Sequence, residues 1–332
     1  MTMPQPPQFL PEAPTDLLSD VLRSLRVSGA IFLRGQFTEP WGVSAPTAAD
    51  MATLLKPGAG RTLIFHIVFE GPCWINLESG ESSRLRAPGI IFMPHGHSHL
   101  LADQAGRTHK PVADMLPPLP WTEFPVLDHG GGGERTKIIC GYLHFSNFVF
   151  APLLAELPNL IAFELSDRTE AGSLQPILEY ISQEAGEARP GSASLVFRLA
   201  ELFFAEVLRR HGKSLANGDA GWFTALNDRH LGRALQLLHE NPDHDWRVEE
   251  LANAVATSRS TLASRFKEKL GYGPIQYLSK WRIQLAARQL AETDIAISEL
   301  AARVGFASES AFYRAFYRET GVSPGAWRSQ AR

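Results

Sequence analysis

The chain has 332 residues, of which 44% are hydrophobic and 20% are charged. This is the composition of an ordinary globular protein with two or three domains, and it excludes disordered, collagen-like and coiled-coil chains. The net charge of −3 is unevenly spread: residues 222–332 carry fifteen Lys and Arg against twelve Asp and Glu, or +3, whereas residues 1–221 carry −6. The basic end of the chain is therefore its carboxyl-terminal third.

Residues 1–26 are predicted to form a proline-rich arm followed by a short amphipathic helix over Asp16–Leu25. No signal peptide is recognisable there, and no apolar run reaches the ~18 residues of a membrane span. Two cysteines cannot form a disulfide framework, and without a Cys-x-x-Cys pair they favour a reducing compartment. We therefore expect a cytoplasmic protein with no membrane partner.

Residues 27–150 consist of short apolar runs separated by Gly and Pro. Their period-2 alternation predicts an antiparallel β-sandwich or barrel. The expected strands are Ala30–Arg34, Leu63–Phe69, Trp74–Leu77, Gly89–Met93 and Lys137–Phe145.

Residues 151–211 have helical periodicity, which predicts an extension with helices over Ser173–Ala188 and Ser194–His211. In the second helix, Leu195, Leu199, Leu202, Phe203 and Val207 form one apolar stripe, which Val196 and Phe204 widen. Such a wide stripe indicates either packing on the sheet domain or the interface of a homodimer, and both explanations remain open. Residues 212–221 are polar and glycine-rich, which is typical of a linker.

Residues 222–332 contain one pattern twice, at an offset of 49 and then 50 residues. Leu251, Ala252, Val255, Ser258, Leu262, Phe266, Gly271 and Pro274 recur as Leu300, Ala301, Val304, Ser308, Phe312, Phe316, Gly321 and Pro324. Each copy predicts a short helix, a tight turn, a serine N-cap and a second helix that ends at glycine. Too many cap and turn positions agree for a helical bundle duplicated for stability alone. The pattern is typical of an all-α double helix-turn-helix domain.

The second helix of each copy should bury its apolar i, i+4 pair, Leu262 with Phe266 and Phe312 with Phe316. The outward positions are then Arg259, Ser260, Thr261, Ala263, Ser264 and Lys267 in the first copy, and Glu309, Ser310, Tyr313, Arg314, Tyr317 and Arg318 in the second. Ser258 and Ser308 cap helix N-termini, which favour phosphate. A helix over Pro274–Ala291, ~27 Å long, would hold the copies apart by a distance that suits successive major grooves.

The segment from about Trp222 to the end resembles the AraC/XylS family of bacterial transcription regulators. The likeness is carried by residues 248–252, 258–260, 265–267, Trp281-Arg282 and the closing run from Ala301 to Pro324. By this resemblance, the bases are read by Ser260, Thr261, Ala263 and Ser264 in the first copy and by Glu309, Ser310, Tyr313 and Arg314 in the second. Arg314 is the leading candidate because a guanidinium can bond bidentately to guanine O6 and N7.

Residues 27–150 resemble the cupin sensor domains that precede this module in one AraC subfamily. Gly89–Met93 followed by Pro94, Gly96 and His99 looks like the second cupin motif, but the first motif retains only His66. Two interpretations remain open. Either His66, His97 and His99 bind a transition metal such as Zn, or His66 and His99 are hydrogen-bonded barrel residues and His97 lies on an exposed turn.

Cys73 and Cys140 are candidates for a redox switch or for metal ligands, or they are small buried strand residues. The sequence as a whole predicts a DNA-binding transcription regulator, not an enzyme, whose cupin-like domain senses an unknown effector, a metal or a redox signal. The expected partners are double-stranded DNA, a second copy of the chain and, for an activator, RNA polymerase. The alternative is a metal-dependent cupin enzyme fused to a DNA-binding module, which the degraded first motif disfavours. A cysteine-based DNA repair protein would need a thiolate cluster that the chain lacks.

Overall fold

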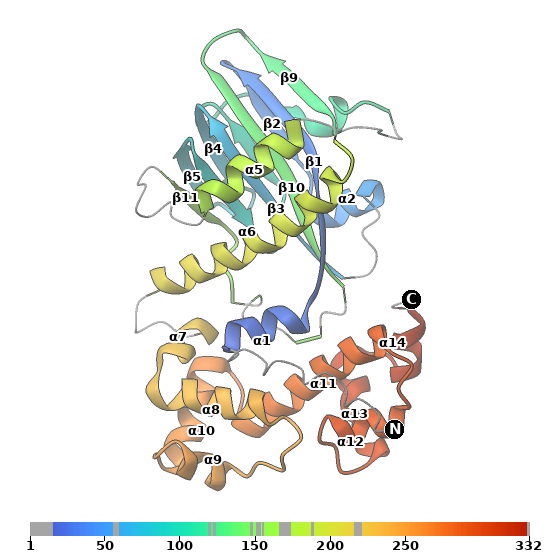
Figure 1. Ribbon diagram of the computed structural model, residues 1–332. Coiled ribbons are helices and arrows are strands. Elements are labelled where there is room, and N and C mark those ends of the chain that lie inside the picture. The colour runs from blue at the N-terminus through green and yellow to red at the C-terminus, as the bar shows by residue number, and fades with distance from the viewer. Residues whose placement is uncertain are drawn as a thin grey trace, which may run out of the picture. The chain divides into compact units, whose positions relative to one another are not determined.

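A computed structural model describes residues 16–55, 60–118, 121, 124–146, 149–150, 154, 156–165, 174–186, 189–215 and 221–330. The predicted arm at residues 1–15 and residues 216–220 of the predicted linker lie outside this part of the chain. The described residues divide into two compact units (Figure 1). A strand-rich unit takes its residues from Arg26–Phe148 and Pro152–Ala216, and a helical unit takes its residues from Met1–Leu25, Val149–Ala151 and Asn217–Arg332.

Two β-sheets form the strand-rich unit. One sheet has six strands in the order β11-β6-β3-β10-β1-β9, and the other has five in the order β5-β4-β7-β2-β8. The strands are β1 (Arg26–Thr38), β2 (Gly42–Ala45), β3 (Arg61–Glu70), β4 (Pro72–Leu77), β5 (Ser82–Arg86), β6 (Gly89–Met93), β7 (His99–Ala102), β8 (Lys110–Pro111), β9 (Val126–Gly130), β10 (Arg135–Ser146) and β11 (Ile161–Glu164). Ile64 and Ile138 of the larger sheet share one core with Ile75 and Leu101 of the smaller sheet.

All five predicted strands are present, as β1, β3, β4, β6 and β10. The prediction of an antiparallel barrel needs correction. Among the described strands no closed barrel is found, and two of the pairs, β1 with β9 and β2 with β8, are parallel. Closure needs a hydrogen-bond ladder that continues around the whole sheet, and the edge strands of these two sheets are only two to five residues long. Alternation of apolar residues reveals a strand but not its partner.

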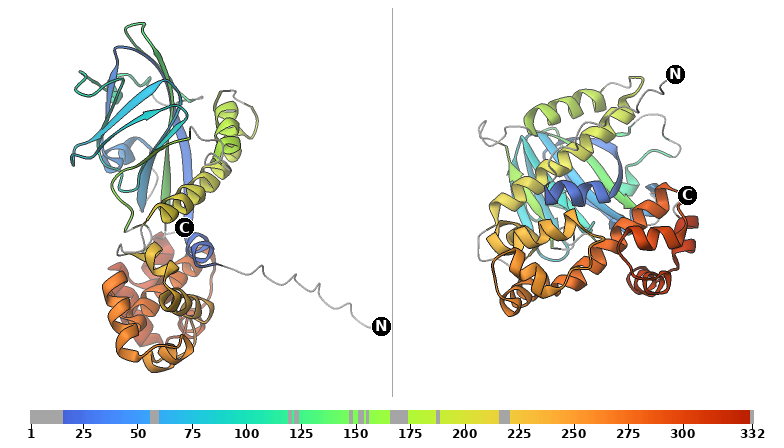
Figure 2. Two further views of the ribbon diagram at one scale, coloured as in Figure 1. Left: turned by 90° about the vertical axis from the view of Figure 1, so that its left-hand side faces the viewer. Right: turned by 60° about the horizontal axis from the view of Figure 1, so that its bottom comes forward.

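Helices α5 (Leu174–Gly186) and α6 (Ser192–Ser214) accompany the sheets, and α6 crosses the outer face of the larger one (Figures 1 and 2). Phe203 and Phe204 of α6 contact Phe65 and Phe145, with ring centroids 5.4 and 5.2 Å apart. Both faces of β3 are therefore buried, which explains its nearly continuous apolar sequence. The extension predicted as helical also contains β11, which pairs with β6. A short helix α2 (Ala48–Leu55) and a 3₁₀ turn η1 (Val112–Asp114) complete the unit.

Helices make up the second unit. They are α1 (Leu17–Ser24), α7 (Trp222–Asn227), α8 (Arg229–Glu240), α9 (Val248–Ala254), α10 (Arg259–Leu270), α11 (Pro274–Glu292), α12 (Ile297–Arg303), α13 (Glu309–Thr320) and α14 (Pro324–Gln330). The predicted amphipathic helix at the start of the chain is α1, which Asp16 caps and which contacts α8 and α11. The predicted helix between the two repeats is α11. In the described part of the chain, no helix is both long and apolar enough to cross a membrane.

Candidate DNA-binding surface and sensor cavity

The two repeats fold as two similar helix pairs, α9 with α10 and α12 with α13. In each pair a serine hydroxyl caps the second helix: Oγ of Ser258 accepts from the Thr261 amide at 3.1 Å, and Oγ of Ser308 accepts from the Ala311 amide at 3.2 Å. Gly271 and Gly321 end these helices in the left-handed conformation. These caps confirm the start and end predicted for the second helix of each repeat.

The turn inside each pair needs a left-handed residue. Gly305 supplies it in the second pair with φ +86°, and a Cβ there would lie 2.6 Å from the Cα of Asp243. In the first pair Ala256 adopts φ +54°, a conformation that is unusual for a residue with a Cβ. The sequence predicts this turn only in the second pair, because only there is the left-handed residue a glycine.

The orientation of the second helices agrees with the sequence prediction. Leu262, Phe266, Phe312 and Phe316 are fully buried. The predicted contact residues lie on the opposite side: Arg259, Ser260, Thr261, Ser264, Lys267, Ser308, Glu309, Ser310, Tyr313, Arg314 and Arg318 are exposed, and Ala263 is half-buried. The buried pairs therefore confirm which face of α10 and α13 is turned outward, while DNA contact by these residues stays a prediction.

Some of the cationic side chains on this surface form ion pairs with acidic residues of the protein, and others do not. Arg259 pairs with Glu249 at 2.8 Å, and Arg318 pairs with Glu319 at 3.0 Å. Among the described residues, the side chains of Lys267 and Arg314 make no ion pair and no hydrogen bond. A guanidinium that is exposed and unpaired can bind a base edge or a phosphate without first losing a protein partner.

Arg282, on α11, uses its guanidinium within the helical unit. Its guanidinium donates to the carbonyl oxygens of Pro242 at 2.5 Å and His244 at 2.8 Å, and it lies over the ring of Phe306. Arg282 therefore ties α11 to the loop that precedes α9.

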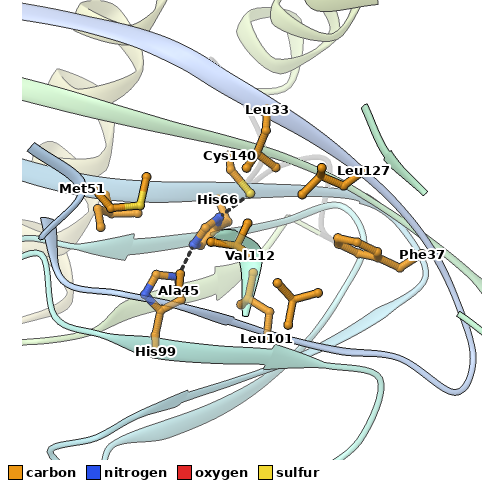
Figure 3. A pocket seen from close by; sticks show the side chains of 12 residues that line it. Leu33, Phe37, Ala45, Met51, His66, His99, Leu101, Val112, Leu127 and Cys140 are labelled. Atoms are coloured by element: carbon orange, nitrogen blue, oxygen red, sulfur yellow. Dashed lines mark hydrogen bonds between the residues drawn. The ribbon is translucent and has the colours of Figure 1, made fainter. Parts of the chain in front are cut away.

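A small cavity of about 30 Å³ lies in the core of the strand-rich unit (Figure 3). Its lining is apolar apart from two histidines and a cysteine: Leu33, Phe37, Val43, Ala45, Met51, Ile64, His66, His99, Leu101, Val112, Leu127 and Cys140. A cavity of this size has room for a water molecule or two, whereas ligand pockets usually measure ~300–1,000 Å³. A larger molecule could enter only if the surrounding strands moved apart.

The three polar side chains of the cavity form one hydrogen-bonded chain (Figure 3). The ring of His99 donates through Nδ1 to the carbonyl oxygen of His97 at 3.0 Å, so Nε2 of a neutral His99 carries no hydrogen. His66 therefore donates from Nε2 to Nε2 of His99 at 2.8 Å, and the Cys140 thiol donates to Nδ1 of His66 at 2.9 Å. Each bond fixes the direction of the next one, and the cavity wall is uncharged.

The structure brings together only part of the predicted metal set. His66 and His99 are in contact, but the ring of His97 bonds to Asn159 Oδ1 at 3.0 Å instead. The described residues contain no group of three or more His, Cys, Asp and Glu side chains arranged to hold a metal ion. Sequence reasoning did not connect Cys140 with the two histidines, because their proximity results from the pairing of β3 with β10. Metal binding by these histidines stays a prediction.

Both cysteines are buried, and burial raises the pKa of the Cys73 thiol and of the Cys140 thiol above the ordinary range. A thiol with a raised pKa stays protonated at neutral pH and is a poor nucleophile. The buried-strand interpretation accounts for this placement. A redox role for either cysteine remains a prediction, and it would require a change of structure that exposes the sulfur.

The buried histidines should make the strand-rich unit acid-labile. Burial lowers the pKa of His99 from 6.5 to about 4, and it also lowers the pKa of His66. Between these two pKa values, His99 is protonated in the unfolded chain but neutral in the folded protein. The contribution of neutral His99 to the free energy of unfolding is therefore fully present above pH 6.5. It decreases by about 1.4 kcal/mol per pH unit as the pH drops towards 4.

Denaturant unfolding at pH 7.5 and pH 5.0 should show a loss of about 2 kcal/mol from His99 alone. The variant His99→Gln keeps a polar partner for His66 but cannot titrate in this range, so its loss should be smaller by that amount. An equal loss in both proteins would show that His99 is not the buried titrating group.

Both units match known protein families. A cupin family model matches residues 16–213, and a helix-turn-helix domain model matches residues 251–330. An AraC-like transcription regulator of Streptomyces lividans is 32% identical over 290 residues, which cover 86% of this chain and 93% of that protein. The RCS-specific transcriptional activator RclR of Escherichia coli (strain K12) is 27% identical over 280 residues, which cover 84% of this chain and 89% of that protein.

Among solved structures, the DNA-binding domain of AdpA in complex with a target DNA is 33% identical, covers 31% of this chain and 91% of its own, and gives a TM-score of 0.30. The cupin match precedes the helix-turn-helix match along the chain. The chain belongs to the AraC family of transcription regulators, with a cupin domain followed by a helix-turn-helix domain.

Proposed function

We propose that this regulator reads a specific duplex sequence with two helix-turn-helix units, α9–α10 and α12–α13, and that the state of its cupin domain changes this binding. The observation that carries the proposal is the outward face of α13. There Tyr313, Arg314 and Tyr317 are exposed above the buried Phe312 and Phe316. This surface offers a free guanidinium and hydroxyl groups on a rigidly packed helix, as direct readout of a major groove requires.

The helix that joins the two units supports reading of two neighbouring grooves. α11 has 19 residues, and at 1.5 Å per residue it is ~28 Å long. Its Ile283, Ala287 and Leu290 belong to the same core as Phe312 and Phe316, which holds α13 firmly against it. Since one turn of B-DNA measures ~34–36 Å, both units can meet one face of the duplex.

Selection of bound duplexes from a random DNA pool tests this function. The full-length chain should enrich a site with two short conserved boxes about one helical turn apart. Binding to the enriched duplex should weaken as the salt concentration rises, because phosphate contacts release counterions. Enrichment of a single box would contradict the proposal for one of the two units, and no enrichment would contradict sequence-specific binding.

We also propose that the chain acts as a homodimer through α6. Val196, Phe203, Phe204 and Val207 are buried, whereas Leu195 and Leu202 are 42% and 54% exposed. With the half-buried Leu199 they continue one apolar strip at i, i+4 and i+7, a spacing suited to a second helix. The two explanations of the wide stripe thus apply to its two sides. Sedimentation of the complex with the selected duplex should give two chains per site, and one chain per site would rule out this dimer.

The cupin domain is proposed to act as a sensor and not as an enzyme. Its cavity offers neutral, mutually bonded polar groups, and the raised pKa of the Cys140 thiol leaves it without a ready nucleophile. An effector that enters must widen the space between the sheets, and this gives it a means to change the structure. As a regulator of transcription the chain would act in the cytoplasm, with RNA polymerase as a partner if it is an activator.

A further inference from the structure

Among the buried polar side chains of the helical unit, that of Gln284 bonds to the backbone of two distant segments. Gln284, in the middle of α11, is fully buried. Its Oε1 accepts hydrogen bonds from the backbone amides of Val149 and Phe150, both at 2.9 Å, and its Nε2 donates to the carbonyl oxygen of Ser24 at 2.9 Å. Since a buried amide is costly unless its donors and acceptors are paired, these bonds hold three backbone groups at fixed positions.

The backbone segments held by Gln284 flank two strands of the cupin domain. Ser24 precedes the start of β1 at Arg26 by two residues, and Val149 follows the end of β10 at Ser146 by three. The two strands are neighbours in the larger sheet, where Arg26 pairs with Ser146. A single side chain of the DNA-binding unit therefore fixes the chain just before β1 and just after β10.

Neighbouring contacts strengthen this anchor on both segments. The ring of Phe150 meets Tyr277 of α11 edge-on, with centroids 5.3 Å apart. One turn after Gln284, Nη1 of Arg288 donates to the carbonyl oxygen of Arg23 at 2.9 Å. This bond adds a second contact between α11 and the segment that precedes β1.

The same two strands line the sensor cavity. Leu33 of β1 and Cys140 of β10 are paired in register, and both face the cavity. Cys140 also begins the hydrogen-bonded chain through His66 to His99. A change that widens this cavity by moving β1 or β10 would act on the chain that leads from these strands to Ser24 and Val149.

We propose that Gln284 is the positioning residue that couples the cupin domain to DNA binding. Its bonds hold Ser24, two residues before β1, and Val149, three residues after β10, against α11, the helix that separates the two helix-turn-helix units. A displacement of either strand would shift α11 and with it the spacing of α10 and α13. This inference rests on the proposed function, and it locates the coupling at the strand ends and not at the predicted linker, residues 212–221.

The test uses the full-length protein and the duplex selected from the random pool. Gln284→Met keeps the length and much of the volume of the side chain but removes its hydrogen bonds, and Gln276→Met is a matched control at an exposed position of the same helix. Hydrogen exchange is measured with and without DNA in the peptides that cover β1, β10 and Val149–Phe150. In the wild type and in the control, DNA should slow this exchange about tenfold, a typical strength of coupling between sites.

In Gln284→Met the slowing in β1 and β10 should fall below about twofold, while α10 and α13 remain protected by DNA. A purely structural role would weaken protection in all of these elements together. If Gln284→Met keeps the tenfold slowing in β1 and β10, Gln284 is not the coupling residue, although the DNA-binding function stands. If the wild type binds the duplex without any change in β1 and β10, coupling at the strand ends is absent.

A second variant keeps the inference testable if Gln284→Met does not fold. Arg288→Met removes the bond to the Arg23 carbonyl at a half-buried position. The slowing by DNA should then decrease in the peptide that contains α1 and the start of β1 but persist at the end of β10. Equal slowing at both strand ends in this variant would overturn the proposed path. Failure of the wild type to bind any selected duplex would instead overturn the proposed function itself.

Discussion

Replacing Phe316 with alanine should lower the free energy of unfolding of the helical unit by about 3–5 kcal/mol. The ring is fully buried, and its centroid lies 5.6 Å from that of Phe312 and 5.9 Å from that of Trp327. Truncation removes the transfer free energy of a large aromatic side chain and leaves a cavity between α11, α13 and α14. Denaturant unfolding followed by circular dichroism at the helical wavelengths measures the loss.

The next residue in the chain is the natural control for this variant. Tyr317 is 58% exposed, so Tyr317→Ala should change the free energy of unfolding by no more than about 0.5 kcal/mol. The two substitutions remove side chains of similar size, one buried and one exposed, from adjacent positions of one helix. Similar losses in both variants would contradict the inward orientation of Phe316, and the assignment of the outward surface would then fail with it.

Local sequence features were sufficient to predict most of the helical unit. Caps such as Ser258 and Ser308, the terminating Gly271 and Gly321, and the i, i+4 pairs are all set by residues within one or two helical turns of each other. Five strands were predicted for the same reason, because alternation is a property of neighbouring residues. The repeat then strengthened each local signal, since the same pattern occurs twice.

Long-range pairing accounts for what the sequence did not reveal. The parallel partner of β1 is β9, about ninety residues later in the chain, and nothing in either strand specifies the other. The site shows the same limit. His66 and His99 were grouped by motif resemblance, but Cys140 joins them only through strand register, and the ring of His97 turns away to Asn159.

Gln284 illustrates this limit most clearly. In the sequence, Gln284 is one of several polar residues of a helix. A glutamine in a helix usually points to solvent. Only the fold brings Ser24 and Val149 to its side chain from segments more than 130 residues away. A buried glutamine whose amide binds backbone groups of two distant segments could not be recognised from periodicity, because periodicity identifies buried faces and not hydrogen-bond partners.

The variant Arg314→Ala should weaken binding to the selected duplex by about 1–3 kcal/mol and relax the base preference at one position. Arg314 is exposed on α13, and among the described residues it has no ion pair or hydrogen bond that would have to break first. A bidentate bond to guanine distinguishes that base from the other three. Its loss should therefore reduce affinity for the preferred sequence more than for its single-base variants.

Lys267→Ala is the informative contrast, because Lys267 is also exposed and unpaired within the described part of the chain but is predicted to bind phosphate. It should weaken all duplexes alike and reduce the dependence of log K on log salt by about one. Titrations of both variants with the selected duplex and its single-base variants, at two salt concentrations, separate the two roles. If Arg314→Ala leaves the base preference unchanged and only reduces the salt dependence, Arg314 binds the backbone. Base reading by the second unit would then have to come from Glu309, Ser310 or Tyr313 on the same face of α13.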